Sequence, residues 1–281
     1  MDLSPSAAPL ISVLTATPGR ERLGFLRATY ASLRVSLEAA GVDWEWALEI
    51  DGPPENYLPA DVFPDPRVRL GTHGVKTGPA TCRNLALART RGHWVLLLDD
   101  DDLLPPEAIT ALLTAASANP RAWWLTGRGE NLYPDGRRED WPARFPVGPV
   151  APGELTRRTL EFGHVPLHTM TGLFRRELLV ALGGWPALIR DEDSALWLFV
   201  GELKDGVIID DLTYIYRRWP NQTMAQPWFN DRALISRSRT LIAARIEAMS
   251  KLNLAADRPG APRDWSRFIY ADPEVFPFRQ G

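Results

Sequence analysis

Four consecutive aspartates, residues 99–102, directly follow the apolar residues 95–98. Side chains of one sign repel each other, and at the end of a buried strand they are partly removed from water, so the run requires a nearby positive charge. Carboxylates at positions i and i+2 can converge on one hard divalent cation that keeps open positions for phosphate oxygens. The alternative is a solvated acidic loop, or carboxylates favoured by the dipole of a helix starting near Pro106. The run lacks the glycine and the distal glutamate of an EF-hand loop.

The composition is that of an ordinary globular chain. The 281 residues are 45% hydrophobic, and 32 basic against 35 acidic residues leave a net charge of -3. This balance provides no chain-wide field for nucleic acid or an anionic membrane, so partners must be selected locally. One cysteine, Cys82, excludes an internal disulfide and fits a reducing compartment. The first residues lack the features of a signal peptide and no apolar run approaches ~18 residues, so we expect a soluble, cytoplasmic protein.

Short apolar strands alternate with helices along the first half of the chain. We expect strands at residues 10–15, 44–50, 68–70 and 93–98, and helices at residues 25–40, 79–90 and 106–118. This alternation is typical of a mostly parallel, Rossmann-like sheet with helices on both faces, in which ligands lie at the carboxyl ends of the strands. Polar side chains follow three of these strands, at residues 15–17, at Asp51 and at residues 99–102.

The second half of the chain is less regular. A strand is expected at residues 122–127, and residues 129–160 are rich in glycine, proline and charge, which predicts a long functional loop. Residues 229–252 have the pattern of the last long helix. The tail from Ala255 is expected to be extended or disordered, and its aromatic residues are a candidate contact with a membrane surface.

Several motifs occur in a fixed order along residues 10–225. They are ISVLTATPGR (11–20), EIDG (49–52), GPATCRNLALARTRG (78–92), LDDDD (98–102), FRRE (174–177), GGW (183–185), ED (192–193) and YRR (216–218). In this order they resemble the motifs of family 2 glycosyltransferases with the GT-A fold, and the aspartates fall where that family has its Asp-X-Asp motif. The heavy use of arginine, alanine and proline indicates a bacterial source with a GC-rich genome.

The resemblance implies an α/β fold of the GT-A nucleotide-diphospho-sugar transferase type. Its mostly parallel central sheet would be flanked by helices and followed by a C-terminal helical extension. Residues 1–225 would form the transferase domain, with a donor half at about 10–127 and an acceptor half at about 128–225. Residues 226–281 would add a helix and an extended tail packed on the same domain.

The resemblance also implies which residues surround the donor nucleotide. Thr15, Ala16 and Thr17 would pass close to the base, and Arg20 follows them in the same loop. Asp51 would accept a hydrogen bond from the base. A turn-forming role for Asp51 before a glycine and two prolines is the alternative.

The sugar and phosphates of the donor would lie nearer the acidic run. By resemblance, Arg83 would lie close to the base and phosphates, and Asp99 and Asp100 would bind the donor, Asp99 at the ribose or the sugar. Asp101 would hold the metal ion, Mn²⁺ or Mg²⁺. A surface ion pair on its own helix is the simpler reading of Arg83.

An acidic group near residue 192 would complete the catalytic site. The resemblance implies that Asp193 is the general base that deprotonates the acceptor hydroxyl, with Asp191 as the alternative. His168, Trp185 and Glu192 fall in the region where the family shapes its acceptor site. A lone histidine or tryptophan is more often part of the core, and that reading stays open for His168 and Trp185.

The chain departs from the family pattern at two places. Many relatives carry Tyr-Arg-X-His, with the histidine near the metal or diphosphate, whereas this chain has Trp219 at that position. Arg218 could replace the histidine as a phosphate partner. After the first strand, Pro18 and Gly19 stand where relatives have an aromatic residue and an asparagine, which removes a base-stacking group.

The sequence therefore predicts a metal-dependent, inverting, hexosyltransferase-type enzyme. It would move a sugar, from a UDP-sugar by preference, to a hydroxyl of a glycan, a carrier-bound molecule or a natural product. One alternative is a nucleotidyltransferase that forms nucleotide sugars, but residues 17–22 hold one glycine and no lysine. The other is a catalytically silent nucleotide- or sugar-binding module, which would not need a general base. We expect no nucleic-acid partner and a cytoplasmic location, with peripheral contact at the inner membrane face as a variant.

Overall fold

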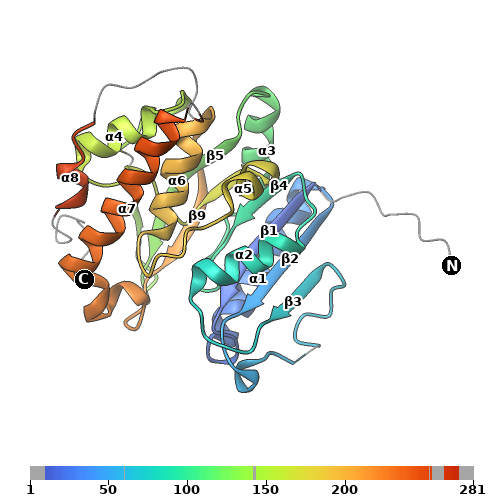
Figure 1. Cartoon of the computed structure of the whole chain (residues 1–281). Coiled ribbons are helices and arrows are strands. Elements are labelled where there is room, and N and C mark those ends of the chain that lie inside the picture. Colours follow the sequence, from blue (N-terminus) through green and yellow to red (C-terminus); the bar gives the residue numbers. More distant parts are fainter. Residues whose placement is uncertain (1–9, 60, 142–143, 253, 255–262, 272–281) are drawn as a thin grey trace.

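The computed structural model describes residues 10–59, 61–141, 144–252, 254 and 263–271. Its strands are β1 (Ile11–Thr17), β2 (Trp44–Ile50), β3 (Val68–Thr72), β4 (Trp94–Leu97), β5 (Trp124–Leu132), β6 (Arg138–Asp140), β7 (Gly148–Val150), β8 (Gly172–Arg175) and β9 (Gly206–Arg217). Its helices are α1 (Leu23–Ala40), α2 (Pro79–Arg89), α3 (Ala108–Ala118), α4 (Glu154–Phe162), α5 (Arg176–Leu182), α6 (Glu192–Leu203), α7 (Arg232–Lys251) and α8 (Ser266–Ile269). Figure 1 shows α4, α6, α7 and α8 gathered on one side of the molecule, with β1, β2 and β3 on the other.

The strands form one mixed sheet. Their order among the described residues is β3-β2-β1-β4-β8-β5-β9-β7, with β6 paired to β5. The strands β3, β2, β1 and β4 are parallel, as the sequence predicts, whereas β8 lies antiparallel between β4 and β5. The carboxyl ends of β1, β2 and β4 therefore meet at one edge of the sheet, where open α/β sheets bind ligands. The α/β class with a helix-covered central sheet is confirmed.

Apolar side chains fill both faces of the sheet. On one face, α1 and α3 pack against inward residues such as Trp46 and Leu96. On the other, α2, α5, α6 and α7 pack around Trp124 and Trp197. Every residue of β2 is buried because the strand is covered on both faces, and its carboxylates, Glu45 and Glu49, are paired with arginines. This packing fixes the positions of the strand ends that carry the polar residues.

The long loop predicted for residues 129–160 is wrong. Residues 129–132 continue β5 and pair in parallel with residues 214–217 of β9, and β6, β7 and α4 follow. The partner strand lies far along the chain and the register shifts between Thr126 and Gly129, so no local apolar pattern marks the strand. The expected strand at residues 122–127 is thereby extended to Leu132.

The end of the described chain packs onto the helices that cover the sheet. α7 contacts α6 and α8, and α8 also contacts α4. Trp265 and Phe268 are buried in the core cluster that contains Trp197. Of the tail predicted to be extended, residues 255–262 and 272–281 lie outside the described residues. Within the described ranges, no helix combines the length and apolarity that crossing a membrane requires.

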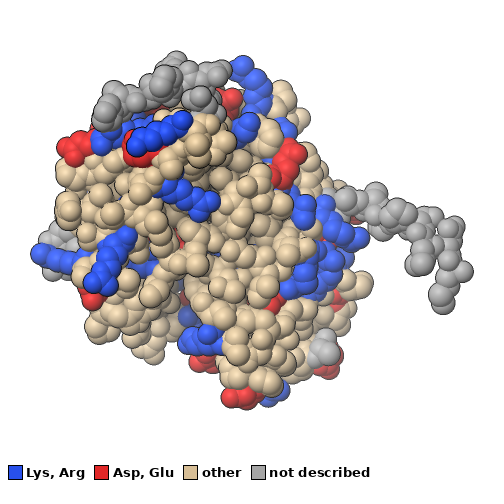
Figure 2. Space-filling view, in the orientation of Figure 1, with Lys and Arg blue, Asp and Glu red and all other residues tan. Residues whose placement is uncertain are grey.

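Charged side chains are mixed over the surface. Figure 2 shows Lys and Arg interspersed with Asp and Glu around a broad uncharged area on the face seen in Figure 1. This distribution agrees with the nearly balanced total of 32 basic and 35 acidic residues.

Candidate active site

The carboxyl ends of β1, β2 and β4 are joined by hydrogen bonds. Thr17, the last residue of β1, donates its hydroxyl to Oδ2 of Asp100 at 2.7 Å, and its carbonyl accepts from the Asp51 amide at 2.8 Å. Thr15 donates its hydroxyl to the Leu98 carbonyl at 2.6 Å, inside the sheet. Thr17, Asp51 and the acidic run of residues 99–102 therefore lie at a common edge, whereas the Thr15 side chain is fully buried.

The four aspartates of the acidic run have different partners. Asp102 is fully buried, and the Tyr214 hydroxyl donates to its Oδ2 at 2.5 Å while the Arg217 amide donates to its Oδ1 at 2.8 Å. Burial raises the pKa of Asp102 well above its usual value, and the neighbouring Asp101 carboxylate adds to the rise. Because both partners belong to β9, Asp102 connects the acidic run to a strand that lies far away along the chain.

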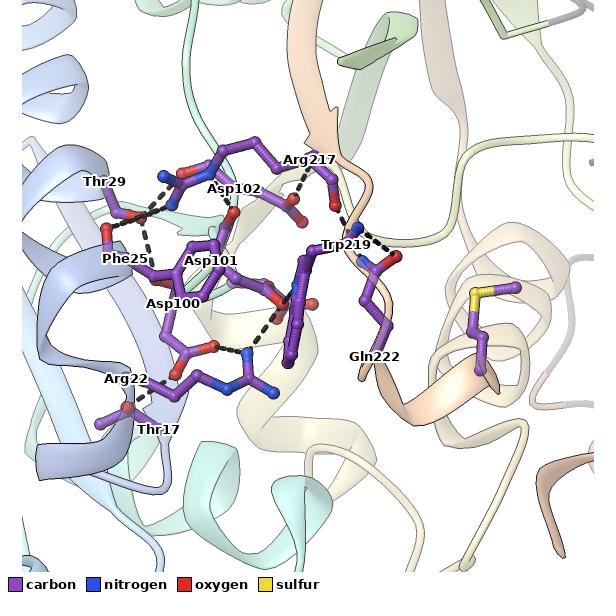
Figure 3. A network of polar contacts seen from close by, with 12 residues as sticks. Thr17, Arg22, Phe25, Thr29, Asp100, Asp101, Asp102, Arg217, Trp219 and Gln222 are labelled. Atoms are coloured by element: carbon purple, nitrogen blue, oxygen red, sulfur yellow. Dashed lines mark hydrogen bonds and ion pairs between the residues drawn. The ribbon is translucent and has the colours of Figure 1, made fainter. Parts of the chain in front are cut away.

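Arg22 neutralises two of the aspartates (Figure 3). Its Nη1 donates to Oδ1 of Asp100 at 3.2 Å and to Oδ2 of Asp101 at 2.7 Å. Trp219, in the loop after β9, donates its indole N–H to the same Asp101 oxygen at 2.9 Å. The Arg22 guanidinium also lies 4.5 Å from the centre of the Trp219 ring. The two donors together fix one carboxylate oxygen of Asp101.

Arg83 connects the acidic run to the acidic residues at the start of α6. It is 3% exposed, and its Nη2 donates to Oδ1 of Asp99 at 2.9 Å. Its Nη1 donates to Oδ1 of Asp193 at 2.9 Å and to Oε1 of Glu192 at 3.1 Å. Burial disfavours the charged guanidinium, but the three carboxylates outweigh this effect and raise the pKa of Arg83. The positive charge that the acidic run requires is thus supplied by arginines.

The carboxylates around Arg83 remain difficult to ionise. Burial raises the pKa of Asp193 to about 8, against the opposing effect of Arg83, and the Glu192 carboxylate adds to the rise. Burial likewise raises the pKa of Asp99 to about 6 and that of Asp100 to about 7. A raised pKa makes Asp193 a stronger base than an exposed aspartate, which is what proton abstraction near neutral pH requires.

Asp191 faces other partners. Its Oδ1 accepts from Nε of Arg190 at 3.4 Å, and its Oδ2 lies 3.4 Å from Nε of Arg239. Among the described residues it is also the one non-glycine residue with a positive φ, 62°. Asp191 thus has one hydrogen bond, to Arg190, and one ion-pair contact, with Arg239, and neither arginine belongs to the contacts of the acidic run. Asp193, in contrast, shares Arg83 with Asp99.

The acidic run fits a divalent metal ion. Asp99, Asp101 and Asp102 each offer one carboxylate oxygen within 4.8 Å of the others. Asp102 uses both of its oxygens, but the described contacts engage only Oδ1 of Asp99 and only Oδ2 of Asp101. The remaining oxygens, at positions i and i+2, are the hard ligands that Mg²⁺ and Mn²⁺ prefer. Trp219 offers no lone pair and so cannot be a further ligand.

A second polar cluster, which we call the β2 corner, consists of Asp51, His73 and Cys82. Asp51 accepts backbone N–H groups from Thr77 at 2.6 Å and from Gly78 at 3.1 Å, so it orders the loop that leads into α2. His73 Nε2 lies 3.8 Å from Oδ1 of Asp51. Cys82 is fully buried in α2, and burial raises the pKa of its thiol to about 12.

Three other residues predicted to bind the donor are placed as follows. Ala16 is partly exposed in β1, beside the joined strand ends. Arg20 donates its Nε–H to the Tyr57 carbonyl at 2.8 Å. The Arg218 guanidinium lies 5.4 Å from the centre of the Tyr216 ring.

Two residues predicted for the acceptor region are buried. The His168 ring lies among aromatic rings, with centroid distances of 4.5 Å to Trp141 and 5.0 Å to Tyr214. Burial lowers the pKa of His168 to about 3, so the ring is neutral at physiological pH. Trp185 is 1% exposed and lies beneath Arg83, whose guanidinium is 5.9 Å from its ring centre. Both side chains support the site from within the core in this structure.

Sequence reasoning missed several residues of the site. It did not identify Arg22, Tyr214 and Arg217 as the partners of the acidic run, nor the indole N–H of Trp219 as a donor to Asp101. The requirement for a positive charge near four aspartates was a usable signal. The sequence could not say which of its arginines meets that requirement, because Arg22 and Asp101 are 79 residues apart along the chain.

Half of the chain is similar in sequence to a known protein family. Residues 44–183 match the sequence model of Glycosyl transferase family 2, a span that includes the β2 corner and the acidic run but not Asp193. A segment of 56 residues is 38% identical to the succinoglycan biosynthesis protein ExoO of Rhizobium meliloti (strain 1021). That segment covers 20% of this chain and 16% of the ExoO protein, so this chain spans a small part of that relative.

Solved structures show the same fold. TarS 1–349 of S. aureus in complex with UDP-GlcNAc has a TM-score of 0.65 and 17% sequence identity, over 89% of this chain and 68% of that chain. The mannosyltransferase PcManGT from Pyrobaculum calidifontis, in complex with GDP-Man and Mn2+, has a TM-score of 0.51 and 16% identity, over 95% of this chain and 69% of that chain. At these identities the likeness concerns the fold.

Proposed function

The chain belongs to glycosyl transferase family 2, and from this premise we propose that it transfers a sugar from a nucleotide-diphosphate sugar to a hydroxyl group with inversion. The supporting observation is the shared Arg83, which holds Asp99 and Asp193 at 2.9 Å each. One buried guanidinium thereby keeps a donor carboxylate and an acceptor carboxylate at its two ends. This arrangement suits a single displacement, because both reactants must be oriented at once.

On the donor side, the proposal assigns the joined strand ends to the nucleotide sugar. Asp51 accepts a hydrogen bond from the base, and Asp99 contacts the ribose or the sugar. Asp99 and Asp101 hold a divalent cation through the oxygens that the described contacts leave available. Such an ion, when bound, neutralises the charge that develops on the departing diphosphate. Arg22 and Arg83 add fixed positive charge beside it.

On the acceptor side, Asp193 is the proposed general base. In a single displacement the acceptor oxygen attacks the anomeric carbon opposite the leaving phosphate, and a carboxylate takes its proton. Burial raises the pKa of Asp193 to about 8, and the 2.9 Å contact with Arg83 fixes its orientation. Asp191 is the less suitable base because its partners, Arg190 and Arg239, do not connect it to the acidic run as Arg83 connects Asp193.

The proposed donor is a UDP-sugar, with dTDP-sugars and GDP-sugars as the donors to compare. The choice is supported by the TarS complex with UDP-GlcNAc, whereas PcManGT was solved with GDP-Man. We expect the acceptor among glycans, carrier-bound molecules and natural products, and we expect the reaction to take place in the cytoplasm. Calorimetric titration of UDP, dTDP, GDP and CMP, each with Mn²⁺ and again with a chelator, tests this choice. Failure of all four to bind would overturn the proposal.

The role of Asp193 is tested with matched variants. Asp193→Asn keeps the side-chain shape and removes the base, so we expect kcat to fall about 10²–10⁴-fold while UDP still binds with Mn²⁺. Asp191→Asn is the control, and its kcat should stay far above that of Asp193→Asn. Undiminished turnover in Asp193→Asn would refute the assigned base.

A further inference from the structure

The β2 corner brings together three different metal-ligating atoms. One carboxylate oxygen of Asp51, one ring nitrogen of His73 and the sulfur of Cys82 all lie within 4.8 Å of one another. Carboxylate, imidazole and thiolate are the ligands that zinc takes in proteins, at distances of about 2.0–2.3 Å. The acidic run, in contrast, offers carboxylate oxygens alone.

His73 has the orientation of a metal ligand. Its Nδ1 lies 3.1 Å from Oε1 of Glu49, and Glu49 is itself paired with Arg89. Because a carboxylate can only accept, Nδ1 donates, and in the neutral ring Nε2 carries the lone pair. Nε2 faces the corner, 2.9 Å from the Thr77 hydroxyl and 3.8 Å from Oδ1 of Asp51. Histidine ligands of metals usually donate their other ring N–H in this way, to a carboxylate, a backbone carbonyl or a water molecule.

The three side chains of the corner differ in their exposure to solvent. The side chains of His73 and Asp51 are 16% and 11% exposed, whereas Cys82 is fully buried. An ion can therefore reach the imidazole and the carboxylate from solvent. A water molecule from solvent can complete a four-coordinate shell.

We propose that the β2 corner binds zinc through Asp51, His73 and Cys82, with water as the fourth ligand. Tetrahedral zinc holds its ligands about 3.3–3.7 Å apart, so atoms now within 4.8 Å need to approach by at most about 1.5 Å. The Cys82 thiol loses its proton to solvent as the sulfur–zinc bond forms. The thiolate and the Asp51 carboxylate then balance the two positive charges of the ion.

Bound zinc excludes the donor base. This consequence rests on the proposed function, in which Asp51 accepts a hydrogen bond from the base. The Asp51 oxygen that ligates zinc cannot accept that bond at the same time, so zinc and the donor base compete for this oxygen. The sulfur and imidazole of the corner select zinc, whereas the oxygens of the acidic run select Mg²⁺ or Mn²⁺.

Cobalt titration of the full chain tests the site. Co²⁺ bound by a thiolate gives an intense sulfur-to-metal absorption band, which an all-oxygen site does not give. We expect this band in the wild-type chain, its displacement by Zn²⁺ and its absence in Cys82→Ser. His73→Gln changes a partly exposed residue and should weaken Zn²⁺ binding at least about tenfold. Asp101→Asn is the control that keeps the band, and circular dichroism checks that each variant is folded.

The outcomes separate the zinc site from the proposed function. Absence of the band in the wild-type chain, or its persistence in folded Cys82→Ser, would overturn the zinc site whether or not UDP binds to the chain. A band that UDP removes while the concentration of free Co²⁺ is held constant supports both the zinc site and the place of the base, because the diphosphate itself binds Co²⁺. A band that persists while calorimetry shows bound UDP supports the zinc site and refutes the place of the base.

Discussion

The acidic run and the β2 corner both hold carboxylates at the ends of parallel strands, yet their partners differ. In the acidic run, Arg22 lies 2.7 Å from Asp101 and Arg83 lies 2.9 Å from Asp99. At the β2 corner, Asp51 accepts backbone amides, and no arginine among the described residues pairs with it. One edge of the sheet thus contains a part neutralised by cations and a part satisfied by hydrogen bonds.

The difference follows from how many charges each part buries. Several carboxylates in one poorly solvated region repel each other, so they need positive partners. Even with those partners, burial raises the pKa of Asp99 to about 6 and that of Asp100 to about 7. A single carboxylate such as Asp51 can be stabilised by two amide donors. The acidic run is therefore suited to bind cations, and Asp51 is suited to accept hydrogen bonds.

The largest effect on the stability of the acidic run is expected from a substitution of Arg83. In Arg83→Gln, three carboxylates lose their buried partner, so we expect the free energy of unfolding to fall by about 3–5 kcal/mol at neutral pH. Urea denaturation measures the change. The loss should shrink at lower pH, where Asp99 and Asp193 take up protons.

An exposed arginine provides the matched control for Arg83. Arg34 pairs with Glu38 one turn along α1, on the surface. Arg34→Gln should leave the free energy of unfolding unchanged within error, because such surface pairs contribute little. An equally small change in Arg83→Gln would mean that the acidic run is solvated and that the comparison is wrong.

The next effect separates cation-dependent from cation-independent binding. Asp101→Asn removes a proposed metal ligand, so UDP affinity in the presence of Mn²⁺ should fall about 10²-fold and become indifferent to a chelator. Asp51→Asn removes an acceptor of hydrogen bonds and should weaken UDP about tenfold, with or without Mn²⁺. Calorimetry of both variants gives the four affinities. The same dependence on Mn²⁺ in both variants would remove the distinction between the two parts.

The pH dependence of turnover tests the buried carboxylates. Burial raises the pKa of Asp193 to about 8, and a general base must be deprotonated, so kcat/KM should rise with pH and level off near that value. Below it, each pH unit should cost about tenfold in kcat/KM. The free energy of unfolding changes with pH in the opposite direction, because the Asp193 carboxyl binds its proton more tightly in the folded chain than in the unfolded chain. The free energy of unfolding should thus decrease as the pH rises from about 4 toward 8.

A steady-state pH profile of the wild-type chain measures this dependence directly. The control is Glu161→Gln, which changes an exposed glutamate of α4 and should leave the profile in place. A rise of kcat/KM with an apparent pKa near that of an exposed aspartate would contradict the effect of burial on Asp193.

The smallest effect concerns Trp219, which donates to Asp101 where many relatives carry histidine. Trp219→His adds a lone pair beside Asp101, and because imidazole is a modest ligand for Mn²⁺ we expect about threefold tighter Mn²⁺ binding. Trp219→Phe keeps a ring over Arg22 without any lone pair and should not tighten binding. Calorimetric titration of Mn²⁺ compares the two variants. An equal gain in Mn²⁺ affinity in both variants would show that the indole only blocks the ion sterically.

Much of the fold could be predicted from local patterns. The strand at residues 44–50 and the helix at residues 79–90 agree with β2 and α2 almost to the residue. Apolar runs and helical spacing mark such elements because they depend on neighbours in the sequence. The strand at residues 129–132 escaped prediction because its partner is residues 214–217, and pairing at that distance leaves no local pattern.

The candidate site was predictable in part for the same reason. Motifs located Asp51, Arg83 and the acidic run, and the family match covers all of them. The assignment of Asp193 stays a prediction. That Asp102 turns inward to Tyr214 while Asp101 meets Arg22 could not be read from four identical neighbours. Side chains of the same type differ only in what the fold places around them.

The residues alone predict that strands end in carboxylates and that four adjacent negative charges need positive partners. The tertiary structure alone decided which arginines supply that charge, and that Arg83 reaches both Asp99 and Asp193. It also decided that Asp51, His73 and Cys82 share one corner. The physical reason is that charge and chain composition are local properties, whereas burial and distance depend on the packing of segments far apart in the chain.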